Sequence, residues 1–290
     1  MKLLGSYRNG NYTVTIFDDG TKVRFTNAAV FSPYKPESID IKITNRCNMG
    51  CPMCHEDSRP DGNNADLLNI PFIDTLLPYT ELAIGGGNPL EHPDLEQFLR
   101  LCKEKNLIAN MTVHQNHFIS KSDKIDHLIN CGLIHGLGVS VQWTSPALAH
   151  MLKDYPNAVV HVINGVIDME ELSELYDNDL KVLILGYKDF RRGVSNHSVL
   201  TDRLMKEMYD RLPEMLDRFA AVSFDNLAIK QLDVKRLMSE EEWNNFYMGD
   251  DGQFTMYIDM VKREFAKSSI SETRWPVTND IRTMFDKIRE

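Results

Sequence analysis

Three cysteines follow directly after a short segment that has the pattern of a β-strand. From Ser38 to Thr44, isoleucines alternate with other residues at a period of two, which predicts a strand. The polar loop after this strand carries Cys47, Cys51 and Cys54 with the spacing C-x3-C-x2-C. Thiolate ligands favour soft metals and iron–sulfur clusters, and a four-iron cubane normally takes four of them. Three cysteines would leave one iron with an open coordination position, which is where a metal centre performs chemistry.

The segment CNMGCPMC resembles the cluster-binding signature of the radical SAM enzymes. The resemblance implies that Cys47, Cys51 and Cys54 bind one [4Fe-4S] cluster, and that S-adenosylmethionine chelates the open iron through its amino and carboxylate groups. It also implies an enzyme that cleaves this cofactor reductively to a 5′-deoxyadenosyl radical, which abstracts hydrogen from a substrate. Such an enzyme needs a one-electron reductant as a partner, such as a flavodoxin or a ferredoxin.

The same cysteines match three other patterns. Cys51 to His55 matches the CxxCH pattern of haem c attachment, and CPMC matches a thioredoxin-type redox pair. Haem c attachment normally follows export, and the first residues contain no apolar run for a signal peptide. A thioredoxin-type pair leaves Cys47 without a role. A zinc site would need a fourth ligand, and Cys102 and Cys131 stand alone in the sequence.

The composition describes a globular protein with enough apolar residues for a large core. The 290 residues are 42% hydrophobic and 26% charged, and no apolar run reaches the roughly 18 residues of a membrane span. Five cysteines, three of them clustered, do not make a disulfide framework. We therefore expect a reducing cytoplasm, which an oxygen-sensitive cluster would also need. The net charge of −10 argues against broad binding to nucleic acid.

Residues 1–36 predict a small antiparallel β-meander. Asn9-Gly10 and Asp19-Gly20 are hairpin turn signals between β-rich runs, and Pro33 and Pro36 mark the end of the segment. We interpret the meander as a cap on the main fold, with a separate peptide-binding module as the alternative.

From residue 37 onward, expected strands alternate with expected helices, which predicts an α/β fold with right-handed parallel crossovers. Six units predict a partial (β/α)6 TIM-like barrel over residues 37–230, with a doubly wound open sheet as the alternative. Residues 231–290 are expected to be a C-terminal helix and hairpin extension that closes the barrel. The expected strands lie at 39–44, 81–85, 107–113, 136–142, 158–164 and 180–186, and a seventh candidate lies at 219–224.

Helical periodicity and capping signals lie between these strands. Apolar faces predict helices over 94–106 and 120–130, and Ser145 and Asp168 are expected N-caps. Residues 194–218 predict one or two helices broken near Pro213, because proline disrupts a helix interior. Further along, we expect a capping box at Ser239 and Glu242, a hairpin turn near 260–263 and a last helix over 280–289.

A glycine run follows the second expected strand: Gly85, Gly86, Gly87, then Asn88 and Pro89. Glycines let a backbone approach a ligand closely. The run resembles the GGEP segment of the radical SAM family, which contacts the amino group of the methionine moiety of the cofactor. Asn88 stands where the family has glutamate, and it keeps a hydrogen-bond acceptor without the charge.

Polar residues at the ends of the later strands are further candidates. The third strand ends in His114, Gln115, Asn116 and His117, which we expect to line the cofactor and substrate cavity. Ser140 and Gln142 share one face of the fourth strand, where the family meets the ribose and carboxylate of the cofactor. The resulting candidates for cofactor binding on the later strands are Asn116, Ser140, Gln142, Asn164, Leu185, Gly186 and Tyr187.

The resemblance is partial on the fifth and sixth strands. VINGVID resembles the second half of the family's adenine-supporting motif, with Gly165 and Asp168 at matching positions. The backbone from Leu185 to Tyr187 fits the segment that meets the adenine ring. His161 is interpreted equally as a core residue or a site residue. Arg191 and Arg192 suit either a bound carboxylate or phosphate, or a solvated loop.

The substrate is less constrained than the cofactor. No cysteine follows Cys131, so a single cluster without auxiliary clusters is expected. A peptide or protein substrate is slightly favoured, because the meander edge could accept an added strand. A nucleoside or small metabolite is the alternative, since polar residues line the expected barrel mouth. A non-catalytic iron–sulfur or zinc-binding scaffold or sensor is the alternative from another class.

Overall fold

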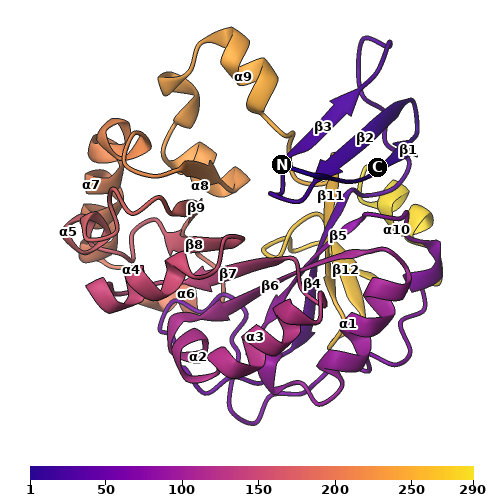
Figure 1. Ribbon diagram of the computed structural model, residues 1–290, viewed down its shortest axis with the longest axis horizontal. Coiled ribbons are helices and arrows are strands. Elements are labelled where there is room, and N and C mark those ends of the chain that lie inside the picture. The colour runs from indigo at the N-terminus through magenta and orange to yellow at the C-terminus, as the bar shows by residue number, and fades with distance from the viewer.

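Two sheets make up the β-structure of the computed structural model, which describes residues 1–290 (Figure 1). The smaller sheet is the antiparallel meander that the sequence predicts, in the order β1-β2-β3. Its strands are β1 (Leu3–Asn9), β2 (Tyr12–Phe17) and β3 (Lys22–Phe25).

The larger sheet has ten strands in the order β10-β9-β8-β7-β6-β5-β4-β11-β12-β13. Neighbours from β10 to β11 are parallel, and β12 and β13 add antiparallel strands at one edge. The two outermost strands, β10 and β13, do not pair with each other, so the barrel is open. Its strands are β4 (Ser38–Thr44), β5 (Glu81–Gly86), β6 (Ile108–His114), β7 (Gly136–Ser140), β8 (Ala158–Ile163), β9 (Lys181–Leu185), β10 (Ala221–Phe224), β11 (Thr255–Asp259), β12 (Glu264–Ala266) and β13 (Trp275–Pro276).

Helices follow most of the parallel strands. The α-helices are α1 (Leu95–Glu104), α2 (Gln115–Ser120), α3 (Ser122–Asn130), α4 (Pro146–Lys153), α5 (Met169–Ser173), α6 (Arg192–Asn196), α7 (Val199–Leu216), α8 (Asn226–Gln231), α9 (Glu240–Phe246) and α10 (Ile281–Lys287). Short 3-10 turns lie at η1 (Ile73–Thr75), η2 (Pro89–Glu91) and η3 (Val234–Leu237). No helix is both long and apolar enough to cross a membrane.

The expected α/β fold is confirmed, including the seventh candidate strand, which is β10. Ser145, Asp168 and Ser239 cap helices as expected, and Ser239 forms its capping box with Glu242. The hairpin expected near 260–263 joins β11 to β12. Its first strand lies beside β4 in parallel, which places it next to the strand that leads into the cysteine loop.

The expected break near Pro213 is wrong, because α7 runs from Val199 to Leu216 with Pro213 inside it. A proline lacks the N–H that would bond the carbonyl four residues earlier. That carbonyl belongs to Tyr209, and it accepts a hydrogen bond from Arg236 Nη2 at 2.6 Å instead. The Arg236 guanidinium also lies 3.8 Å from the Tyr209 ring centre. The arginine therefore satisfies the group that the proline leaves unpaired.

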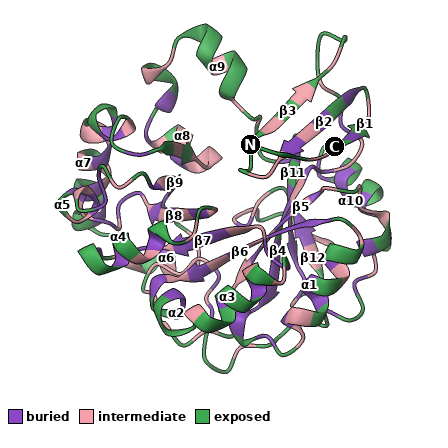
Figure 2. Cartoon of the chain, viewed as in Figure 1, coloured by how far each residue is buried: buried purple, intermediate pink, exposed green.

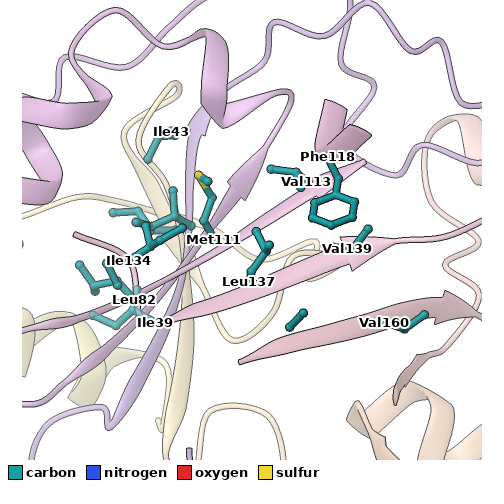
Figure 3. Close-up of a cluster of buried hydrophobic side chains, with 14 of the residues drawn as sticks. Ile39, Ile43, Leu82, Met111, Val113, Phe118, Ile134, Leu137, Val139 and Val160 are labelled. Atoms are coloured by element: carbon teal, nitrogen blue, oxygen red, sulfur yellow. The ribbon is translucent and has the colours of Figure 1, made fainter. Parts of the chain in front are cut away.

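The parallel strands have one apolar face and one polar face. Side chains on the apolar face pack beneath the helices into a single core, part of which Figure 3 shows around Ile39, Met111 and Val139. The inner face carries small or polar residues in register across the strands, including Asp40, Ala83, Asn110 and Gly136. Strand residues accordingly alternate between buried and partly exposed (Figure 2). The inner face is therefore free to line a site.

The meander is attached to the large sheet through a buried ion pair. Glu37 is 0% exposed and lies directly before β4. Its carboxylate accepts hydrogen bonds from Arg24 Nε at 2.8 Å and from the Tyr12 hydroxyl at 2.6 Å. Lys22 lies 3.5 Å from the same carboxylate. Three residues of the meander thus depend on one charge at the start of the barrel.

Replacing Glu37 with glutamine should destabilise the fold, because the partly buried Arg24 guanidinium would lose its paired carboxylate, whereas Lys22 would keep Glu81. Breaking a buried pair in this way costs about 3–5 kcal/mol. Urea unfolding of wild type and Glu37→Gln measures the loss. Glu96→Gln is the matched control, since its pair with Arg100 is solvent-exposed and should contribute nothing measurable. Equal unfolding free energies for Glu37→Gln and wild type would contradict the assignment.

Candidate active site

The three clustered cysteines lie on the loop after β4, at the carboxyl end of a central parallel strand. Sites in barrels of this type gather at that end of the strands. Cys47, Cys51 and Cys54 are free thiols and partly exposed. No three side chains among His, Cys, Asp and Glu converge on a position for one metal ion. The C-x3-C-x2-C spacing on one loop fits the expected cubane, in which each cysteine would bind a different iron.

The cysteine loop is closed by its own backbone. Cys47 N donates to Arg59 O at 2.9 Å, and Arg59 N donates to Asn45 O at 2.9 Å. Asn45 N reaches Asn63 O at 2.8 Å, so the chain returns alongside the end of β4. Between these contacts, Cys54 N donates to Cys51 O at 3.2 Å in a tight turn. Backbone hydrogen bonds thus hold the loop on both sides of its three partly exposed thiols.

The glycine run after β5 pairs with the chain just before Cys47. Gly87 N donates to Thr44 O at 2.8 Å, and Asn88 N donates to Arg46 O at 2.7 Å. A Cβ on Gly87 would lie 2.1 Å from Arg46 O, and Gly86 has a φ of +113°. Both positions therefore require glycine. Gly85 differs, because a Cβ there would meet nothing within 4 Å.

Asn88 is buried at the N-terminus of η2, which starts at Pro89. Its Oδ1 accepts a hydrogen bond from Leu90 N at 3.2 Å, whereas its Nδ2 is buried without a partner. The unpaired group is therefore a donor, which would meet a carboxylate and not an ammonium. The expected contact to the amino group of the cofactor therefore stays a prediction, and it concerns the backbone of the glycine run. The unpaired buried donor suits a polar ligand beside the cysteine loop.

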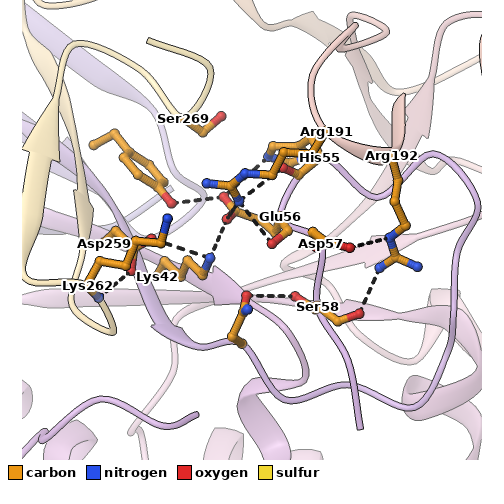
Figure 4. A network of polar contacts seen from close by, with 12 residues as sticks. Lys42, His55, Glu56, Asp57, Ser58, Arg191, Arg192, Asp259, Lys262 and Ser269 are labelled. Carbon is orange, nitrogen blue, oxygen red and sulfur yellow. Dashed lines mark hydrogen bonds and ion pairs between the residues drawn. The ribbon is translucent and has the colours of Figure 1, made fainter. Parts of the chain in front are cut away.

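A buried network of charges anchors the chain directly after Cys54 (Figure 4). Glu56 Oε2 lies 2.7 Å from Lys42 Nζ of β4, which in turn lies 3.4 Å from Asp259 Oδ2 of β11. The Tyr257 hydroxyl donates to Glu56 Oε1 at 2.9 Å. Lys42, Glu56 and Asp259 are each at most 6% exposed. Hydrogen bonds and paired charges are what make such burial tolerable.

Glu56 stays ionised in this network. Burial raises its pKa, but His55 and Lys42 lower it further, to about 2. Burial and the nearby Lys188 lower the pKa of His55 to about 3, so its imidazole is neutral at pH 7. At that pH the cationic partners of the Glu56 carboxylate are therefore Lys42 at 2.7 Å and Arg191 at 3.2 Å.

Arg191 and Arg192 bind the cysteine loop from the other side of the barrel. Arg191 Nη1 donates to Glu56 O at 3.0 Å and to His55 O at 3.3 Å. Arg192 Nη2 donates to Ser58 O at 2.7 Å, and its Nε lies 3.1 Å from an Asp57 carboxylate oxygen. The two arginines hold protein carbonyls and carboxylates, so they are neither a solvated loop nor a free anion site.

The candidates on β6 and β7 divide into two groups. Gln115 is fully buried and joins the two strand ends, because its Oε1 accepts from Gln142 N at 2.6 Å and its Nε2 donates to Trp143 O at 2.9 Å. His117 Nε2 lies 3.0 Å from Asn48 Oδ1 of the cysteine loop. Asn116, in contrast, is exposed on α2.

Ser140 and His161 lie side by side in register on the inner face of β7 and β8. A Cβ on Gly138 would lie 2.3 Å from His161 Cε1, so the imidazole occupies the space over this glycine. His161 is partly exposed, and burial lowers its pKa to about 4. The imidazole therefore faces the barrel interior in its neutral form and is not part of the apolar core.

The ends of β8 and β9 are held by α8, which sequence reasoning missed. Gln231 Oε1 accepts from Tyr187 N at 2.9 Å and from Asn164 Nδ2 at 3.0 Å, and Gln231 Nε2 donates to Tyr187 O at 2.9 Å. Asp225 Oδ1 accepts from Gly186 N at 2.9 Å while it caps α8. An N-cap pattern at Asp225 was the one local signal available.

A small cavity of about 40 Å³ joins the cysteine loop to these strand ends. It brings candidates from two motifs together, since the loop and β9 both contribute to its wall. Asn164 directly follows Ile163 of the cavity wall, and its Oδ1 is buried without a hydrogen-bond partner. The residues that line the cavity are Met53, His55, Ile163, Leu185, Gly186, Tyr187 and Lys188.

The family model of the radical SAM superfamily matches residues 41–168, which include the cysteine loop and the glycine run. The PqqA peptide cyclase of Gluconobacter oxydans is 26% identical over 108 residues, which cover 36% of this chain and 30% of that protein. The PqqA peptide cyclase of Methylorubrum populi is 27% identical over 128 residues, covering 42% of this chain and 33% of that protein. The matched region is thus about a third of the length of these curated relatives.

Solved structures of Streptococcus suis SuiB have a similar fold. SuiB bound to precursor peptide SuiA has a TM-score of 0.60 at 15% identity, covering 89% of this chain and 65% of that chain. Another SuiB structure has a TM-score of 0.59 at 12% identity, covering 100% of this chain and 87% of that chain. At this identity the likeness concerns the fold. The cysteine spacing, the glycine run beside it and the family model together assign residues 41–168 of this chain to the radical SAM superfamily.

Proposed function

We propose that this protein binds one [4Fe-4S] cluster on Cys47, Cys51 and Cys54, binds S-adenosylmethionine at the open iron, and abstracts hydrogen from a peptide or protein. One observation carries the proposal. The only loop that clusters three free cysteines is paired through its backbone to the glycine run, at the carboxyl end of the parallel strands.

A [4Fe-4S] cluster held by the three cysteines would supply one electron for the reductive cleavage of bound S-adenosylmethionine to methionine and a 5′-deoxyadenosyl radical, which would take a hydrogen atom from the substrate. The protein binds and orients the reactants and excludes water. A one-electron reductant such as a flavodoxin or ferredoxin supplies the electron. The residues proposed to hold the cofactor are Gly85, Gly86, Gly87, Asn88, Pro89, Asn116, Ser140, Gln142, Asn164, Leu185, Gly186 and Tyr187.

A single cluster fits the remaining cysteines. Cys102 is fully buried within α1, where burial raises its pKa to about 12. Cys131 is the C-cap of α3, so neither of these residues lies on the loop that carries the other three cysteines. We therefore keep the proposal of one cluster, with the three thiolates of the loop as its protein ligands.

A peptide substrate is favoured by two features. The curated relatives are named as peptide cyclases, and a solved structure of similar fold holds a precursor peptide. The meander also has unpaired edges at β1 and β3, where an extended peptide could add a strand.

Anaerobic reconstitution with iron and sulfide, followed by dithionite and S-adenosylmethionine, tests the activity. Wild type should assemble the cluster and release 5′-deoxyadenosine, measured by chromatography. Cys51→Ala should lose both, because one iron loses its protein ligand, whereas Cys131→Ala should retain both. A cluster without any cofactor cleavage would support the scaffold interpretation, and thiol exchange without iron would support the redox pair.

Adding one methyl group should have different effects at Gly87 and at Gly85, two positions of the same glycine run. Gly87→Ala places a Cβ against Arg46 O and should shift the backbone ahead of Cys47, at a cost of about 1–3 kcal/mol. We expect its iron and sulfide content to fall several-fold after reconstitution. Gly85→Ala is the control, because its Cβ meets open space and should leave the cluster content at the wild-type level. Equal cluster content in the two variants would show that the backbone contact is not needed.

The substrate class can be tested before the substrate is identified. An extract of the native host cells is separated by ultrafiltration into a macromolecular fraction and a metabolite fraction, and each is added to the reconstituted enzyme. A peptide or protein substrate should accelerate release of 5′-deoxyadenosine only in the macromolecular fraction, and protease treatment should abolish the effect. Acceleration by the metabolite fraction alone would favour a nucleoside or small metabolite.

A further inference from the structure

Gln142 is the only side chain that donates a hydrogen bond to any of the three clustered cysteines. Its Nε2 lies 3.4 Å from Cys51 Sγ and 3.9 Å from Met53 Sδ. Gln142 follows β7. In the sheet, β6 and β5 lie between β7 and β4, the strand that leads into the cysteine loop. The contact therefore joins two parts of the barrel that are 91 residues apart in sequence.

The position of this amide is set by its neighbours. Gln142 N donates to Gln115 Oε1 at 2.6 Å, and Gln115 is fully buried. On the other side, Val141 N donates to His161 O at 2.9 Å, which continues the pairing with β8 beyond the end of β7. The backbone at Gln142 is thus held from both adjacent strands. From this backbone position, the partly buried side chain of Gln142 extends to the sulfur of Cys51.

We propose that Gln142 is a positioning residue that tunes the reduction potential of the proposed cluster through an N–H···S hydrogen bond to Cys51. This inference rests on the proposed function, because it requires the cluster. A hydrogen bond to a thiolate withdraws negative charge from the sulfur. The reduced cluster carries one more negative charge than the oxidised cluster, so the bond stabilises the reduced state more and raises the potential.

The hydrogen bond also makes the three thiolates unequal. Cys51 is the one of the three that receives a side-chain donor, whereas Cys47 receives a backbone hydrogen bond from Met49. Reduction adds one electron to the cluster, supplied by dithionite in the test and by a one-electron reductant in the cell. The amide of Gln142 takes no part in that transfer and loses no proton.

The test is a potentiometric titration of the reconstituted protein, followed by the electron paramagnetic resonance signal of the reduced cluster. Gln142→Met keeps the length of the side chain and removes the donor, and its midpoint potential should shift to a more negative value. Gln97→Met is the matched control, because Gln97 is exposed on α1, and its potential should equal that of wild type. An unchanged potential in a fully loaded Gln142→Met protein would overturn the proposal.

A second measurement does not depend on a variant that assembles the cluster. Wild-type protein labelled with ¹⁵N in the glutamine side-chain amide is reduced and examined by electron–nuclear double resonance. A nitrogen coupling to the cluster is expected for an N–H···S bond at this distance, and its absence would contradict the inference. If wild type assembles no cluster at all, the proposed function fails first, which distinguishes that outcome from a failure of this inference alone.

Discussion

The close approach of two backbone segments places the candidate site. Gly87 and Asn88 donate to Thr44 and Arg46, so the end of β5 is joined to the residues just before Cys47. No side chain larger than hydrogen fits at Gly87, because the carbonyl of Arg46 occupies the space. The two motifs that carry the resemblance are therefore parts of one structural unit. This backbone pairing brings the cysteine loop and the glycine run together at the ends of the neighbouring strands β4 and β5.

Buried charge provides the second support, and it comes from the far end of the chain. Glu56, two residues after Cys54, is held by Lys42 of β4 and by Tyr257 of β11. Removing one partner of such a network leaves an uncompensated buried charge, whereas the complete network is tolerated. Strand β11 thus has two roles, since it extends the parallel sheet and it supplies polar partners to the loop. The C-terminal hairpin is consequently linked to the cysteine loop as directly as the strand that precedes it.

Local patterns were enough to predict most strands, several caps and the three cysteines. Ser145, Asp168 and Ser239 are caps whose partners lie within three residues, so their signal is contained in the sequence. Contacts between distant residues left no such signal. The pairs Tyr257–Glu56 and Arg236–Tyr209 depend on tertiary packing, and the second of them explains why Pro213 does not end its helix. The roles of Gln231 and Gln115 were hidden for the same reason, because an amide has no sequence pattern that reveals its partner.

The same strands serve stability on one face and the site on the other. Alternation sends Ile39 and Ile41 toward the helices, where their burial stabilises the fold, and sends Asp40 and Lys42 inward. Asp40 is reached by solvent, yet confinement within the barrel raises its pKa to about 6. An inner face with carboxylates, neutral imidazoles and glycines contributes little to the core. Because these residues are not needed for packing, their presence across several adjacent strands suits a ligand site on that face.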